Sequence, residues 1–101
     1  MNNDLKMIAE HFGPRKQLAK MIEECSELIE AVNVYHDDLV LDSNPLDAGI
    51  HRLHVVEEMA DVQILIDQLT HLLYAKDELK QMREFKIERT KQRMKDGYYG
   101  S

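Results

Sequence analysis

Cysteine, proline and glycine are scarce in this chain, with one, two and four residues respectively among 101, and long apolar runs are absent. The single cysteine has no partner, which argues against a disulfide framework. No segment is apolar enough to span a bilayer, and the N-terminus lacks the apolar core of a signal peptide. No glycine-rich phosphate loop of the Walker type is present. We therefore expect one cytoplasmic domain, residues 1–101, that is not a P-loop enzyme.

Acidic side chains outnumber basic ones by 19 to 13, and the two signs are unevenly distributed. Residues 1–79 hold 16 acidic and 6 basic side chains, whereas residues 80–101 hold 3 acidic and 7 basic. The acidic body would repel the phosphates of a nucleic acid duplex, so we expect no nucleic acid and no membrane partner. A compact acidic site that holds cations, beside a basic segment, suits a small polyphosphate better.

Two short acidic motifs lie within apolar, helix-periodic segments. Glu24 and Glu27 are three residues apart, as are Glu58 and Asp61, so each pair rises from one side of a helix about one turn apart. Two such helices side by side would gather four carboxylates, and removing each from water costs roughly several kcal/mol. Because hard divalent cations take oxygen ligands, a divalent cation is the simplest group that offsets this charge.

The helical phase places the second pair of carboxylates differently from the first. On a wheel centred on Val62, Glu58 falls at about 40°, inside the expected apolar face, and Asp61 at its edge near 100°. Glu24 and Glu27 lie at about 100° and 160° from the centre of their own apolar face, so they flank it. A solvated acidic face therefore stays open as the alternative for the first pair, but Glu58 does not fit it. The expected apolar faces comprise Leu18, Met21, Ile22, Cys25, Leu28, Ile29 and Val32 on the first helix, and Val55, Met59, Val62, Leu65, Ile66, Leu69 and Leu73 on the second.

Apolar spacing and turn residues predict longer helices at about residues 4–12, 15–35, 51–74 and 77–95. Gly13 and Pro14 should end the first of them. Residues 37–50 are expected to form a long connection that either contains a short helix near 46–50 or works as a flap over a ligand. The helix at 51–74 is apolar over much of its circumference, which favours oligomerisation through it. Residues from about 97 to 101 are expected to fray, and Cys25 is expected to be a buried, inert thiol.

Residues 20–28 followed by residues 56–62 resemble the MazG-like all-α nucleoside triphosphate pyrophosphohydrolases. The signature of that family is Glu-x-x-Glu on one helix and Glu-x-x-Asp on the next, each followed by an aliphatic residue. The resemblance spans both central helices and, more weakly, the C-terminal helix. It implies an all-α, MazG-like bundle of four to five helices that oligomerises through the central helices, as a homodimer or homotetramer.

The resemblance also implies a magnesium site, with Mn²⁺ as a substitute, and assigns residues to it. The carboxylates implied as both metal ligands and catalytic residues are Glu24, Glu27, Glu58 and Asp61. The basic residues implied as substrate contacts are Lys20, Lys86 and Arg93. An ordinary ion pair with Glu24 is the alternative for Lys20, and a solvated basic helix end is the alternative for Arg93. Thr90 stands where many relatives have asparagine, which departs from the family pattern.

Two histidines, His51 and His54, fall on the same side of their helix as Glu58 and Asp61, so a transition-metal site is a further hypothesis. The Glu-x-x-His pattern of di-iron bundles is absent from both central helices, which argues against it. The resemblance implies Mg²⁺-dependent hydrolysis of a nucleoside triphosphate, ribose or deoxyribose, to the monophosphate and pyrophosphate, a house-cleaning of nucleotide pools. The alternatives are an enzyme similar to phosphoribosyl-ATP pyrophosphohydrolase and a non-catalytic helical module that oligomerises or binds nucleotide.

Overall fold

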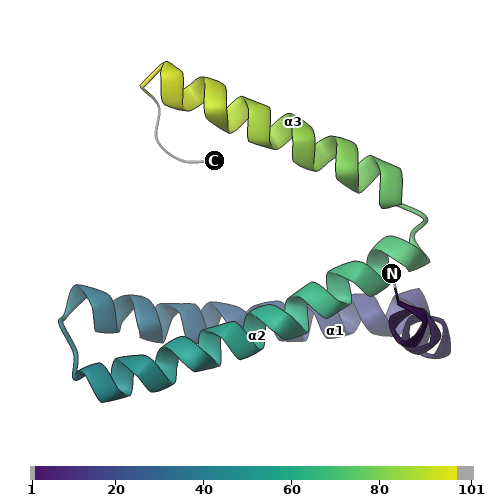
Figure 1. Cartoon of the computed structure of the whole chain (residues 1–101). Helices are drawn as coiled ribbons and strands as arrows, with labels where there is room; N and C mark the ends of the chain where they lie inside the picture. Colours follow the sequence, from purple (N-terminus) through teal and green to yellow (C-terminus); the bar gives the residue numbers. More distant parts are fainter. Residues whose placement is uncertain (1, 98–101) are drawn as a thin grey trace.

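Three α-helices account for nearly all of the chain in the computed structural model, which describes residues 2–97 (Figure 1). They are α1 (Asn3–Val40), α2 (Pro45–Leu72) and α3 (Lys76–Lys95). The all-α fold class expected from the sequence is confirmed. Across the described residues, none of the helices combines the length and the apolar character needed to cross a membrane. The expected fraying of residues 98–101 concerns a segment outside the described range.

A kink at Gly13 divides α1 without ending it. Gly13 has φ 81° and ψ 170°, which are not helical, yet helix continues on both sides and includes Pro14. The asparagine at position 2 caps the N-terminus, because its side-chain oxygen accepts a hydrogen bond from the Leu5 amide at 2.9 Å. The break expected at Gly13 between the helices at 4–12 and 15–35 is therefore confirmed, although the two segments are joined in the single kinked element α1. The described chain has three helices rather than four to five, and the larger bundle is not confirmed.

The connection between α1 and α2 is much shorter than expected. The expectation of a long connection at 37–50 is wrong, because α1 continues to Val40 and α2 already begins at Pro45. Asn44 caps α2 by accepting a hydrogen bond from the Leu46 amide at 2.8 Å, and Pro45 occupies the first turn, where its missing N–H is harmless. Residues 46–50 are helical, as the expected short helix would be, but they are the first turns of α2 rather than a separate element or a flap.

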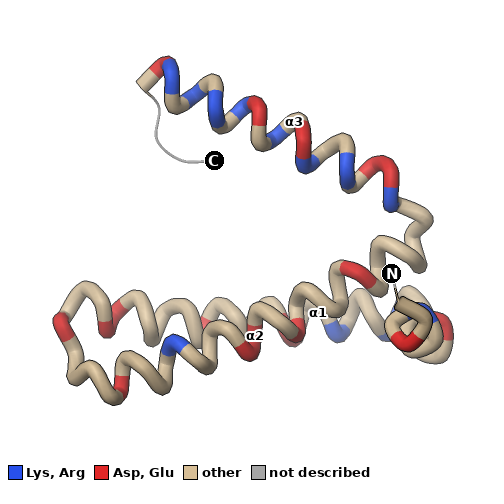
Figure 2. Tube along the Cα trace, viewed as in Figure 1, with Lys and Arg blue, Asp and Glu red and all other residues tan. Residues whose placement is uncertain are grey.

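The first two helices form an antiparallel hairpin, and α3 leaves it at the C-terminal end of α2 (Figure 1). Within the described residues α3 packs only against α2, near their junction, and buries none of its side chains. Lys and Arg side chains are concentrated along α3, whereas most acidic side chains lie on the hairpin (Figure 2). The separation of charge that the sequence indicated is therefore also a separation in space.

The seam between α1 and α2 is lined largely by polar side chains. After the kink, the buried residues of α1 recur every seven positions, at Gln17, Glu24, Ala31 and Asp38, and Ala9 is buried before the kink. The buried residues of α2 are Glu58, Leu65, Gln68 and Leu69. A seven-residue spacing keeps one narrow stripe of a helix facing its partner, so each helix buries one stripe and leaves the rest of its surface uncovered.

The apolar face expected for α1 lies mainly on the outside of the hairpin, so its expected burial is wrong for this chain. Ile22 is 72 % exposed and Ile29 is 61 % exposed. On α2, Leu65 and Leu69 are buried as expected, but Met59 is 55 % exposed. Cys25 is half-buried rather than buried. A hairpin with a projecting third helix has no second layer that could cover these faces.

We expect Gly13→Ala to lower the free energy of unfolding by about 1–3 kcal/mol, because the backbone conformation at Gly13 is essentially restricted to glycine. The matched control is Gly49→Ala, at a helical site where an added Cβ meets no atom within 4 Å. That change should instead stabilise the protein by about 0.5–1 kcal/mol. Urea unfolding followed by circular dichroism measures both effects. Equal effects of the two changes would contradict the kink.

Candidate metal site and the adjoining cleft

Three of the four carboxylates expected to bind a metal come together at the middle of the α1–α2 seam. Glu24 and Glu27 project from α1 and Glu58 from α2, and one ligand oxygen of each lies within 4.8 Å of the others. The one-turn spacing on α1 sets the first pair side by side, and the antiparallel hairpin brings Glu58 across to them. Glu27 is more exposed than the other two. These groups could hold a metal ion.

Each of the two buried glutamates has one carboxylate oxygen with a partner and one without. Glu24 and Glu58 are only 7 % and 8 % exposed. Oε1 of Glu24 lies 3.2 Å from Nζ of Lys20, and Oε1 of Glu58 lies 3.3 Å from Nε2 of His54. In both residues Oε2 is buried without a hydrogen-bond partner. Leaving a buried polar atom unsatisfied costs about 1–3 kcal/mol, and more when it is charged. The partners at i−4 thus occupy one oxygen of each glutamate, and the second oxygen remains available for a ligand.

The cluster supplies the oxygen ligands that a magnesium ion prefers, and the spacing of these oxygens is close to the spacing that one ion requires. Carboxylate oxygens are the ligands that Mg²⁺ and Mn²⁺ prefer. Magnesium binds oxygen octahedrally at about 2.0–2.1 Å, so neighbouring ligands of one ion are about 3 Å apart and opposite ligands about 4 Å apart. Because the three oxygens already lie within 4.8 Å of one another, a movement of about 1 Å by each would bring them to one ion. Side-chain rotation alone covers that movement.

Crowding of like charges changes the protonation of Glu27. The neighbouring Glu24 carboxylate raises the pKa of Glu27, first because it favours the protonated form of Glu27, which can donate to it, and then by charge repulsion, to which Glu58 and Glu23 add. The pKa of Lys20 is also raised, first by its hydrogen bond to Glu24 and then by the charge of Glu23. Both shifts report a negative potential at this point of the seam, and a cation is attracted to such a potential.

Asp61, the fourth expected ligand, is exposed and lies beside the cluster rather than in it. Together with Lys20 and Glu24 it lines a cleft of about 170 Å³ between α1 and α2. The cleft continues past Ile64 to the amides of Gln17 and Gln68. The carboxylate cluster and the cleft share Glu24, so they form one continuous site.

The basic residues expected to contact a substrate are divided between two places. Lys20 lies in the cleft. Lys86 and Arg93 lie on α3, which does not pack against α1 and projects away from the α1–α2 hairpin in Figure 1. The Thr90 hydroxyl donates to the carbonyl of Lys86 at 2.9 Å, an ordinary contact within a helix. The structure thus brings Lys20 to the carboxylates, but not the two residues of α3.

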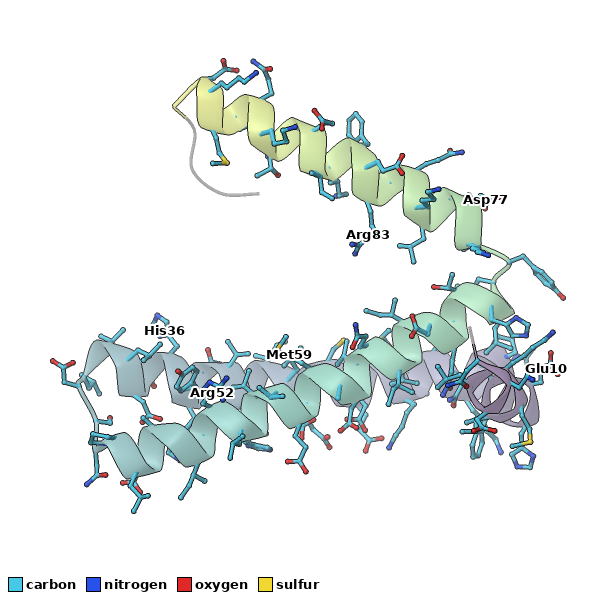
Figure 3. All side chains as sticks on the ribbon, viewed as in Figure 1. Glu10, His36, Arg52, Met59, Asp77 and Arg83 are labelled. Atoms are coloured by element: carbon cyan, nitrogen blue, oxygen red, sulfur yellow. The ribbon has the colours of Figure 1, made fainter. Side chains whose placement is uncertain are left out.

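A second, wider hollow of about 960 Å³ opens where α3 leaves α2. Its lining combines the end of α2, including His71, with the first turns of α3 and Lys6 of α1. Arg83 points from α3 into this space (Figure 3). The hollow contains none of the residues expected from the sequence and lies away from the carboxylate cluster.

Sequence reasoning missed the polar pairs that extend the site along the seam. Gln17 donates through Nε2 to Oε1 of Gln68, and both side chains are buried. At the turn, Nδ1 of His51 on α2 lies 2.5 Å from Oδ2 of Asp38 on α1, so this contact joins the two helices. The signal was present as a seven-residue interval: Gln17 lies seven positions before Glu24, and Asp38 lies fourteen after it.

No family model, curated protein or solved structure matches this chain. The resemblance to the MazG-like enzymes therefore remains a prediction that depends on the two acidic motifs.

Without divalent cations, we expect the melting temperature to fall as the pH rises from the ordinary range of a glutamate through the raised pKa of Glu27. The folded protein binds that proton more tightly than the unfolded chain, so deprotonation removes stability. Glu27→Gln cannot ionise and should lack this fall. Glu30→Gln, an exposed glutamate one turn further along α1, is the matched control and should keep it. Identical pH profiles for wild type and Glu27→Gln would refute the assignment.

Proposed function

We propose that the protein is a Mg²⁺-dependent nucleoside triphosphate pyrophosphohydrolase, which cleaves a ribo- or deoxyribonucleoside triphosphate into the monophosphate and pyrophosphate. The observation that carries the proposal is the pair of buried, unpartnered Oε2 atoms on Glu24 and Glu58, in a cluster completed by Glu27. Apposed carboxylates that already carry one ion pair each are suited to share a divalent cation. The ordered motifs of the sequence support the same reaction.

In this proposal each residue of the site has a stated task. Glu24, Glu27 and Glu58 hold the ion, and Asp61 completes the ligand set from the side of the cleft. Magnesium, when bound, neutralises polyphosphate charge and activates water for attack. Lys20 lines the cleft and carries its ammonium group beside Glu24, so it is placed to bind a phosphate oxygen. Water adds to the α- or the β-phosphorus, the bond from that phosphorus to the oxygen that bridges the two breaks, and a proton of the water passes to solvent.

The exposed apolar faces support assembly into a homodimer or homotetramer. Ile22 and Ile29 lie seven residues apart on one side of α1, and both are mostly exposed. Contiguous apolar surface of this kind is ordinarily covered by a partner. Because α3 stands apart from the cluster of its own chain, Lys86 and Arg93 would contribute to a site only from a second copy. We propose that the working unit is such an assembly.

Two alternative functions are compatible with the same site, and their substrates and products distinguish them. An enzyme similar to phosphoribosyl-ATP pyrophosphohydrolase would act on that substrate and leave ordinary nucleoside triphosphates intact. A non-catalytic helical module, which the exposed apolar faces also favour, would bind nucleotide or a partner without Mg²⁺-dependent release of pyrophosphate. Product analysis over a nucleotide panel separates all three.

Pyrophosphate release from a panel of ribo- and deoxyribonucleoside triphosphates tests the proposal, with Mg²⁺ and after its removal by a chelator. We expect release with Mg²⁺ alone, and a fall of at least about 100-fold in kcat for Glu58→Gln and for Asp61→Asn, since each removes an interaction at the reacting phosphates. Glu57→Gln is the matched control, because Glu57 is exposed beside Glu58. Full activity of the Glu58 variant, with unchanged circular dichroism, would exclude the site.

Light scattering after size-exclusion chromatography tests the assembly. We expect a mass of two or four chains for the wild type and a smaller mass for Ile22→Asp, because a charge at the centre of an apolar contact is left without water. Lys16→Asp, an exposed site on another side of α1, should leave the mass unchanged. Ile22 is exposed within the chain, so its replacement should not unfold the monomer. A monomeric wild type would contradict the prediction.

A further inference from the structure

The cleft beside the carboxylates has a second polar end that the proposed hydrolysis does not use. Seven residues separate Gln17 from Glu24 on α1, and seven separate Gln68 from Asp61 on α2. At 1.5 Å per residue, the two amides lie about 10 Å along the seam from the acidic end. Ile64 lies in the wall between the two ends. A ligand whose phosphates sit at the acidic end would therefore place its remaining part against the amides.

The two amides leave one donor and one acceptor facing the cleft. Gln17 and Gln68 are only 7 % and 3 % exposed, and Nε2 of Gln17 donates to Oε1 of Gln68. That bond leaves Oε1 of Gln17 and Nε2 of Gln68, and neither is among the buried, unpartnered side-chain atoms of the described residues. Both residues line the cleft, so these two atoms are the side-chain groups that can meet a ligand there. If both amides were turned over, the roles of the two residues would exchange, but one donor and one acceptor would still remain.

The size of the cleft limits what can occupy it. Its volume is about 170 Å³. Pockets that enclose a whole drug-sized ligand measure about 300–1,000 Å³, so this cleft accommodates a single ring rather than a fused pair. Ile64 and Leu65 supply an apolar wall for the face of such a ring, while the amides meet its edge.

We propose that this cleft receives the nucleoside part of the substrate and that Gln17 and Gln68 are specificity-determining residues for a pyrimidine nucleotide. The inference rests on the proposed pyrophosphohydrolase function. The edge of a pyrimidine carries hydrogen-bond donors and acceptors side by side, which matches the amide pair. A sugar hydroxyl, which both donates and accepts, is the second source of the same chemistry. A buried polar pair that hydrogen-bonds a ligand discriminates strongly against ligands that leave it unpaired.

The test compares kcat/KM for UTP, CTP, dUTP, dCTP, ATP and GTP. We expect the wild type to prefer pyrimidines at least tenfold. The double variant Gln17→Leu/Gln68→Leu removes both polar partners together and keeps the seam packed, so no amide is left unpaired. It should lose most of that preference, chiefly through KM, while calorimetric Mg²⁺ affinity stays unchanged. Gln63→Leu, an exposed glutamine on α2, is the matched control and should retain the preference.

A second variant identifies the group that is bound. Gln68→Glu still accepts the hydrogen bond from Gln17, but presents an acceptor to the cleft in place of the donor. If the base edge is bound, the ratio of CTP to UTP activity should rise, because cytosine carries an amino donor where uracil carries a carbonyl. If the sugar hydroxyl is bound, the ratio of ribose to deoxyribose substrates should change instead.

Several results would overturn the inference. A wild-type preference for purines would overturn it. Loss of activity by the same factor on all six substrates in the Gln17→Leu/Gln68→Leu variant would also overturn it. An unchanged preference in that variant would also do so. Pyrophosphate release without base preference refutes this inference alone, whereas no release from any triphosphate refutes the proposed function and this inference with it.

Discussion

Two glutamates meet across the α1–α2 seam where a helix pair ordinarily places leucine. Glu24 and Glu58 are buried, each with one oxygen paired to a basic side chain of its own helix and one oxygen without a partner. Each buried charge opposes folding by several kcal/mol unless it is compensated. Lys20 and His54 each contact one of these oxygens, and the pKa of Glu27 is raised first by the adjacent Glu24 and then by the charges of Glu58 and Glu23. The metal site and the adjoining cleft both follow from this apposition.

The same seam explains why the apolar side chains lie on the outside. Each helix of a hairpin can bury only one stripe, and the buried stripe of α1 contains Gln17, Glu24 and Asp38. Ile22 and Ile29 then lie on surfaces that a second copy could cover. The buried face of each helix would thus carry the site, and the exposed apolar face would carry the contacts with a second copy.

The sequence predicted the helices and the burial of Glu58, because both depend on local spacing. It did not predict the burial of Glu24, which appears only as a flanking residue when the apolar residues define the face. The stripe of α1 that faces α2 is the one with polar residues at seven-residue intervals. Which stripe is buried depends on the side chains that α2 presents to it, so the sequence of α1 alone does not determine it.

The short turn was not predicted for a similar reason. Asn44 and Pro45 are residues that favour a turn, but an asparagine followed by a proline also starts a helix, as it does here. Asp38 and His51 lie on different helices and contact each other next to the turn. Such a contact depends on how the two helices pack, so local sequence patterns do not reveal it.

The polar pairs along the seam also determine how the two helices are aligned. Gln17 meets Gln68, Asp38 meets His51 and Glu10 meets His71, so three separate points fix one register. Sliding α2 along α1 by a single turn would break all three pairs and leave the buried side chains of Gln17, Gln68 and Asp38 without partners, whereas a seam of leucines would tolerate the slip. The arrangement that makes the hairpin less stable than an all-leucine pair therefore protects it from misfolding into shifted alignments.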